Sequence, residues 1–134
     1  HTEAAANLLA NGLAEAGVKN IAVYDVSSTH VSDLIAEIFR CSHIVLAAPT
    51  YNNSIYPAMF NLIHDMKCLL LQNRTVGLIE NGTWMPASGK LMRAELEGMK
   101  AMKILDPAVT IKSSLKEDSL AQLNALKDAI VASL

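Results

Sequence analysis

Two polar segments of the sequence carry side chains that can hold a flat, polar ligand. Residues 49–57 read Pro-Thr-Tyr-Asn-Asn-Ser-Ile-Tyr-Pro and combine hydroxyls, amides and aromatic rings. Residues 81–89 read Asn-Gly-Thr-Trp-Met-Pro-Ala-Ser-Gly and include Trp84, the only tryptophan of the chain. Both compositions are also typical of ordinary turns. Because a lone indole in so polar a segment needs a surface to lie against, we interpret the two segments as parts of a binding site.

The two segments together suit a planar heteroaromatic ring. If they follow neighbouring strands, Tyr51 and Trp84 can sandwich such a ring, with stacking worth about 0.5 to 1.5 kcal/mol per contact. Backbone amides of residues 82–89 can then hydrogen-bond the polar edge of the ring. Thr50 and Asn53 can reach a polyol chain attached to it. The pattern favours a flavin.

A third polar group lies at the start of the chain. His1 and Thr2 open a predicted helix, and the amide donors at a helix N-terminus bind phosphate. Ring, polyol and phosphate together make FMN, which would supply the redox chemistry while the protein tunes it through stacking, hydrogen bonds and charge. On this hypothesis Glu80 lowers the flavin potential by disfavouring the anionic reduced flavin.

Helices and strands alternate along the sequence and would position these segments. Apolar residues at a period of 3.6 predict helices, and short apolar or β-branched runs predict strands. The predicted helices cover residues 2–16, 31–40, 57–70, 90–102 and 115–134. The last of them carries Leu120, Leu123, Leu126, Ile130 and Leu134 on one side. The predicted strands cover residues 21–26, 43–48, 75–79 and 104–111. Gly17 is the expected stop of the first helix, and residues 27–29 the expected cap of the second.

This alternation predicts an α/β fold, a doubly wound parallel sheet in a three-layer α/β/α arrangement. The chain of 134 residues fits a single domain, residues 1–134. The uninterrupted apolar run from His43 to Ala48, followed by Pro49, predicts a strand buried on both faces. Ligands of such sheets bind beyond the carboxyl ends of the strands. The two polar segments lie there.

These residues resemble a known family. Pro49 to Asn53 with Pro57, Asn81 to Trp84 with residues 88–89, and the opening His1-Thr2-Glu3 look like the flavodoxin-like domain of flavodiiron proteins, also named A-type flavoproteins. The resemblance covers essentially the whole chain and implies a flavodoxin-like fold that binds FMN. In that family the domain follows a metallo-β-lactamase-like domain, whose two irons receive electrons from FMN and reduce oxygen or nitric oxide.

The resemblance also implies site residues and partners. The residues implied to bind FMN are His1, Thr2, Pro49, Thr50, Tyr51, Asn52, Asn53, Asn81, Gly82, Thr83, Trp84 and Gly89. No side chain is expected to act as a catalytic acid or base. The implied partners are the diiron domain, in the same chain or in a partner subunit, and a redox donor such as rubredoxin or an NADH-linked reductase. A homodimer is a further expectation.

The sequence departs from the family pattern at several points. Relatives carry a strand and a Ser-x-Tyr-Gly segment before the position of His1, and in the strand order 2-1-3-4-5 that strand is central. We therefore expect a gap in the middle of the sheet. Ser54 stands where many relatives have glycine. The four histidines are scattered singly, without the His-x-Glu-x-Asp cluster of a diiron site.

Three alternatives remain open. An NAD(P)H-dependent FMN or quinone reductase has the same fold, but it needs space over the flavin for nicotinamide. A receiver domain requires an aspartate at the end of its phosphorylated strand, where this chain has Pro49-Thr50. A truncated fragment that no longer binds flavin is the structural alternative.

Composition excludes other classes. A formal net charge of -2 with scattered Lys and Arg argues against nucleic-acid binding. The sequence has no run of about 18 apolar residues and no signal-peptide pattern, so we expect a cytoplasmic protein that does not enter membranes. Cys41 and Cys68 lack CxxC spacing and are predicted to be small buried thiols.

Overall fold

The computed structural model describes residues 2–51, 54–82, 88–106, 108–111 and 116–134. The helices are α1 (Thr2–Glu15), α2 (Val31–Arg40), α3 (Pro57–Cys68), α4 (Ser88–Glu97) and α5 (Glu117–Ala132). The strands are β1 (His43–Tyr51), β2 (Ser54–Ile55), β3 (Thr75–Asn81), β4 (Lys103–Ile104) and β5 (Val109–Ile111).

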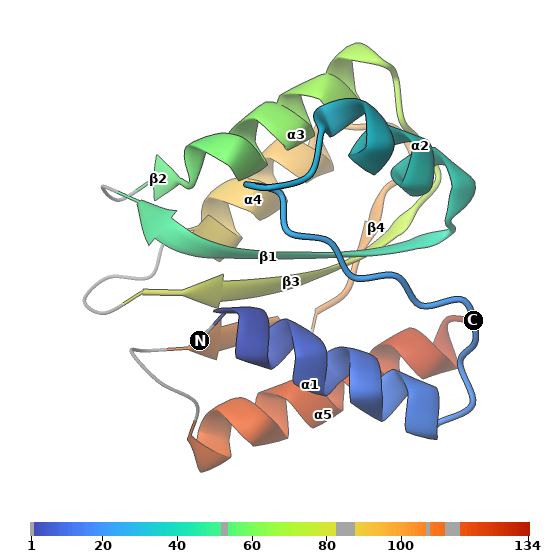
Figure 1. Ribbon diagram of the computed structural model, residues 1–134, viewed down its shortest axis with the longest axis vertical. Helices are drawn as coiled ribbons and strands as arrows, with labels where there is room; N and C mark the ends of the chain where they lie inside the picture. The colour runs from blue at the N-terminus through green and yellow to red at the C-terminus, as the bar shows by residue number, and fades with distance from the viewer. Residues whose placement is uncertain (1, 52–53, 83–87, 107, 112–115) are drawn as a thin grey trace.

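The sheet is parallel except for one short hairpin (Figure 1). β1 pairs along one edge of β3, whereas β4 and β5 pair in succession along the other edge. β2 folds back antiparallel onto the end of β1. The predicted α/β class and parallel sheet are confirmed. The predicted strand over residues 104–111 is divided, since β4 pairs with the beginning of β3 and β5 with its end.

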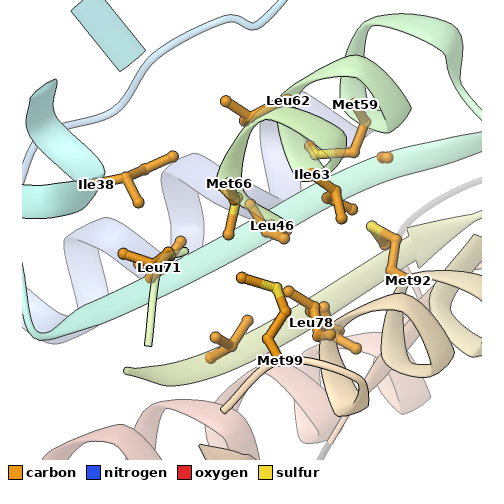
Figure 2. Close-up of a cluster of buried hydrophobic side chains, with 14 of the residues drawn as sticks. Ile38, Leu46, Met59, Leu62, Ile63, Met66, Leu71, Leu78, Met92 and Met99 are labelled. Carbon is orange, nitrogen blue, oxygen red and sulfur yellow. The ribbon is translucent and has the colours of Figure 1, made fainter. Parts of the chain in front are cut away.

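Helices cover both faces of the sheet. α1 and α5 lie on one face, and α2, α3 and α4 lie on the other (Figure 1). Figure 2 shows the core between the sheet and α2, α3 and α4, in which Leu46 and Leu78 of the strands contact side chains from the helices, including Ile63 and Met66. A second core lies under α1 and α5 and contains Leu9, among other residues. The three layers are therefore held by two separate apolar clusters.

The buried positions of α1 follow the apolar period of its sequence. In α1 the buried side chains are Ala5, Leu9 and Leu13, spaced four residues apart on one side of the helix. The helix is followed by Gly17 with a φ of 93°, the left-handed conformation that ends helices at glycine. The predicted stop is confirmed.

The C-terminal helix is less one-sided than its sequence indicates. Leu123, Leu126 and Ile130 are buried, as predicted. Leu120 is 44% exposed and Leu134 is 65% exposed, so their predicted place in the apolar face is wrong. Leu120 lies in the first turn of the helix, and Leu134 lies beyond its last residue, Ala132.

The predicted strand over residues 21–26 is wrong. The structure has extended, irregular chain there, and Ile21, Val23 and Tyr24 are exposed. A β-branched run becomes a strand only when a neighbouring strand accepts and donates its backbone hydrogen bonds. Within the described residues, no strand lies beside this segment.

Several element ends also differ from prediction. β1 continues past Pro49 because it is an edge strand there, where proline is tolerated. α2 is capped by His30, whose Nδ1 accepts from the Ser32 N–H at 3.1 Å, rather than by residues 27–29. α3 ends two residues early, and Leu70 has a φ of 59°. α4 begins at Ser88 and ends at Glu97.

The two cysteines are less buried than expected. Cys41 is half-buried, whereas Cys68 is exposed at the end of α3. The prediction of two buried thiols is therefore wrong for Cys68. Its Sγ lies 3.5 Å from Nε2 of His64, one helical turn earlier.

Candidate functional site at the carboxyl edge of the sheet

The strand register aligns the starts of the two polar segments. Pro49 of β1 lies opposite Asn81 of β3, and Asn81 in turn lies opposite Ile111 of β5. The Gly82 N–H donates to the Ile111 carbonyl oxygen at 3.0 Å, which extends the pairing by one residue. The expectation that the two segments leave the same edge of the sheet is confirmed.

The N-terminus of α1 lies at the same edge. The Asn81 side-chain amide donates to the Thr2 hydroxyl oxygen, with 3.3 Å between Nδ2 and Oγ1. This contact joins residues 79 positions apart in the sequence. It places the first turn of α1, with its free amide donors, beside the ends of β1 and β3.

The carboxylate of Glu80 positions the end of the second polar segment, where the chain enters α4. Glu80 Oε2 accepts from the Gly89 backbone N–H at 2.7 Å, in the first turn of α4. Its other oxygen, Oε1, accepts from the Thr110 hydroxyl at 2.8 Å. A carboxylate at a helix N-terminus is favoured by the helix dipole. Glu80 therefore ties the beginning of α4 to both β3 and β5.

Sequence reasoning missed this role of Glu80, which it treated only as a charge near a flavin. The detectable pattern is an acidic residue at a strand end, followed by a glycine-rich segment and a helix. The fit is close, because a Cβ added at Gly89 would lie 2.9 Å from the Glu80 carboxyl carbon. Any larger residue at position 89 would therefore displace the Glu80 carboxylate.

The structure brings together five of the residues predicted to bind FMN. These residues are Thr2, Pro49, Asn81, Gly82 and Gly89. The backbone of Thr50 and Tyr51 lies at the end of β1. The other predicted residues, namely His1, Asn52, Asn53, Thr83 and Trp84, lie outside the described residues, and so does the predicted ring sandwich.

A large cavity begins at this edge. Its volume is about 1050 Å³, and its lining includes Thr2, Ala48 and Pro49 at the carboxyl end of β1. From there it extends along β1 to Ser42 at the other end of the strand. The candidate site is therefore open toward the interior of the domain.

Two acidic groups that line the cavity are bonded locally. The Ser27 hydroxyl donates to Asp25 at 2.6 Å and holds the pKa of that carboxyl below its ordinary value. The Arg40 guanidinium, hydrogen-bonded to Glu37 at 2.6 Å, likewise lowers the pKa of the Glu37 carboxyl. Both groups are therefore charged at neutral pH and already have hydrogen-bonding partners.

The described residues contain no group of three or more His, Cys, Asp or Glu side chains placed to hold a metal ion. In the same part of the chain, no helix is long and apolar enough to cross a membrane.

His43 Nε2 lies 3.0 Å from the Ser133 hydroxyl, and its Nδ1 lies 2.7 Å from the Ser42 hydroxyl. This histidine connects the end of α5 to the beginning of β1.

Comparison with known proteins identifies the fold. No family model matches the sequence. A curated relative is the nitric oxide reductase of Moorella thermoacetica, 27% identical over 132 residues, which cover 98% of this chain and 33% of that protein. The chain spans about a third of the length of the curated relatives that it matches.

Several solved structures resemble this structure over nearly the whole chain. Rubredoxin oxygen:oxidoreductase from Desulfovibrio gigas matches with a TM-score of 0.91 at 24% identity, over 98% of this chain and 32% of that one. The flavodiiron protein from Giardia intestinalis matches with a TM-score of 0.84 at 19% identity, over 98% and 33% of the two chains. An archaeal flavodoxin matches with a TM-score of 0.83 at 16% identity, over 98% and 89%.

Proposed function

We propose that this chain, a flavodoxin-like domain that matches the flavodoxin-like module of flavodiiron proteins, binds FMN noncovalently and transfers electrons. The observation that carries the proposal is the meeting of Thr2, Pro49 and Asn81 at the carboxyl edge of β1 and β3. Doubly wound sheets bind their ligands at this edge. The Moorella and Desulfovibrio proteins, described as a nitric oxide reductase and a rubredoxin oxygen:oxidoreductase, support a redox role.

The donors at this edge fit the polar parts of FMN. Phosphate accepts hydrogen bonds, and the first turn of α1 offers backbone N–H groups together with the Thr2 hydroxyl. The Asn81 side chain, 3.3 Å from that hydroxyl, adds an amide donor and acceptor. These groups come from two different elements. The fit therefore depends on the tertiary fold as well as on one helix end.

Each part of the site has a distinct role in the proposal. When bound, FMN supplies the redox chemistry. The start of α1 holds the phosphate, residues 49–53 and 81–84 flank the ring, and Glu80 positions the segment that returns to α4. Glu80 also places a negative charge at the end of β3, and we keep the prediction that Glu80→Gln raises the flavin potential. No residue is assigned a proton-transfer role.

The proposed partners follow from the same relatives. We propose that the electrons pass to a diiron metallo-β-lactamase-like domain, in the same polypeptide or in a partner subunit, which reduces oxygen or nitric oxide. The proposed donor is rubredoxin or an NADH-linked reductase. The proposed compartment is the cytoplasm.

The test is FMN titration of the purified chain, with flavin fluorescence as the readout. We expect saturable quenching that Thr2→Val weakens about tenfold, because a lost charge-assisted hydrogen bond costs about 1.5 kcal/mol. The matched control is Thr75→Val, which removes a hydroxyl at the opposite end of β3. It should leave the affinity unchanged.

Two results would contradict the proposal. One is unquenched fluorescence of FMN at all protein concentrations. The other is equal weakening by Thr2→Val and Thr75→Val, which would mean that the hydroxyl at the carboxyl edge has no specific role. Steady-state NADH oxidation by the FMN-loaded chain, without any added partner, would indicate an independent reductase instead.

A further inference from the structure

A chain of hydrogen bonds crosses the sheet at its carboxyl edge. It begins in α5, where Gln122 Oε1 accepts from the Thr110 backbone N–H at 2.7 Å. The Thr110 hydroxyl donates to Glu80 Oε1 at 2.8 Å, and Glu80 Oε2 accepts from the Gly89 N–H at 2.7 Å. Its two ends, Gln122 of α5 and Gly89 of α4, belong to helices on opposite faces of the sheet (Figure 1). We name these four residues the edge network.

Gln122 fixes the backbone of the outer strand. β5 pairs with β3, and no other strand among the described residues pairs with β5. The Thr110 N–H therefore has no strand to accept its hydrogen bond within that part of the chain. Backbone donors that are withdrawn from water need an acceptor, and Gln122, which is half-buried, supplies one from α5. One side chain thus determines where Thr110 lies relative to the helix.

The position of the Thr110 backbone determines where its hydroxyl lies. Threonine is stiff at χ1, so its hydroxyl has few orientations once the backbone is fixed. Thr110 and Glu80 are register partners on β5 and β3, and paired side chains of neighbouring strands lie on the same face. The hydroxyl is therefore directed at the carboxylate. With Oε1 bonded to Thr110, the other oxygen is oriented toward Gly89.

The edge network adjoins the candidate site at two points. Glu80 immediately precedes Asn81, whose side-chain amide donates to the Thr2 hydroxyl oxygen at 3.3 Å. Gly89, at the other point, is buried in the first turn of α4 and is one of the residues predicted to bind FMN. Movement of the Glu80 carboxylate would therefore disturb the site where β3 ends and where α4 begins.

We propose that Gln122 and Thr110 are positioning residues of the candidate site, which act through Glu80 to hold the first turn of α4 at the carboxyl edge and thereby tighten FMN binding. The effect on FMN rests on the proposed function, whereas the effect on α4 needs no flavin. Hydrogen bonds to a carboxylate are stronger than those between neutral groups. Loss of one of its two donors should let the Glu80 carboxylate turn away from Gly89.

Matched variants separate this role from ordinary structural loss. Thr110→Val removes the hydroxyl but keeps the branched shape, whereas Thr110→Ser keeps the hydroxyl. Gln122→Met removes the acceptor at similar length, whereas Gln122→Glu keeps an acceptor oxygen. Asn124→Met is the control for a new methionine, because Asn124 is exposed on the same helix, outside the edge network.

The first measurement is amide hydrogen exchange of the whole chain without FMN. In Thr110→Val and Gln122→Met we expect the Gly89 amide to exchange at least tenfold faster relative to the amide of Leu78, which lies in the middle of β3. A purely structural loss would accelerate both amides alike. Thr110→Ser, Gln122→Glu and Asn124→Met should keep the wild-type ratio.

The second measurement is FMN affinity, from the quenching of flavin fluorescence. We expect about tenfold weaker binding for Thr110→Val and for Gln122→Met, and the wild-type affinity for the three controls. Both residues act through the same carboxylate, so their effects should not add. The double variant should bind FMN within about twofold of Thr110→Val alone.

The outcomes separate the two proposals. An unchanged Gly89 amide in both variants, or equal acceleration of the Gly89 and Leu78 amides, would overturn the positioning role. A selective change at Gly89 with unchanged FMN affinity would overturn the link to binding. Absence of FMN binding by the wild type itself would refute the proposed function and the effect on FMN, and the exchange rates would still decide whether the edge network holds α4.

Discussion

At the scale of single residues, Glu80 determines the geometry of the candidate site. Its two carboxylate oxygens accept from the Gly89 N–H and from the Thr110 hydroxyl, at 2.7 and 2.8 Å. One side chain thereby connects β3, β5 and α4. Polar contacts of this kind add little net stability but are costly to lose when they leave a half-buried group unsatisfied.

Gly89→Ala should break this arrangement. The new methyl group would lie 2.9 Å from the Glu80 carboxyl carbon and Oε2. The carboxylate must move aside, which disturbs its hydrogen bonds to the Gly89 N–H and the Thr110 hydroxyl, so we expect the free energy of unfolding to fall by about 1 to 3 kcal/mol. Urea denaturation measures the change.

Gly98→Ala is the matched control, because a Cβ there would meet only the Glu95 carbonyl oxygen at 3.6 Å, an ordinary contact. Its free energy of unfolding should stay within about 0.5 kcal/mol of that of the wild type. If both variants are equally stable, the carboxylate does not hold the start of α4 as described.

At the scale of elements, α5 approaches β3 closely at Gly77. A Cβ added at Gly77 of β3 would lie 3.0 Å from Cδ1 of Leu126, which is fully buried. The absence of a side chain at Gly77 therefore lets the helix approach the strand. The second core lies at this contact and includes Leu123 and Ile130 of the same helix.

Leu126→Ala should therefore be strongly destabilising. It removes buried methyl groups and leaves a cavity between α5 and β3, a change that costs about 2 to 5 kcal/mol. Leu120→Ala on the same helix is the control, since Leu120 is 44% exposed and should cost less than about 1 kcal/mol. Thermal and urea unfolding compare the two. Similar losses for both would mean that α5 does not dock through Leu126.

At the scale of the whole molecule, β1, β3, β4 and β5 form one parallel sheet (Figure 1). Residues 19–24 line the same cavity as β1 and pair with no strand among the described residues. Backbone stability should differ accordingly, because amides outside a ladder open without breaking the core.

Native-state hydrogen exchange of the chain alone should reveal this difference. We expect the amides of Val76 to Ile79, buried between two paired strands, to exchange at least a hundredfold more slowly than those of Ile21 to Tyr24. Two-dimensional NMR after transfer to D₂O resolves the two sets. Equal protection would mean that residues 21–24 are paired in solution.

The helices and the parallel β-α order could be predicted from the sequence because their information is local. The spacing of Ala5, Leu9 and Leu13 defines a helix face, and Gly17 ends that helix, whatever lies across the molecule. The apolar run after His43 likewise indicates a buried strand. Because the strands are parallel, the segments after Pro49 and Asn81 then lie at the same edge of the sheet.

Tertiary structure alone decided which segments pair as strands and which side chains are buried. Residues 21–26 have the composition of a strand, but a strand also requires a partner backbone, and composition carries no information about whether that partner is present. The contact of Glu80 with Thr110 joins residues 30 positions apart, beyond the reach of a local pattern. The exposure of Cys68 and Leu120 depends on which neighbouring elements cover them. Local periodicity therefore determined the elements, and long-range packing decided their pairing and their burial.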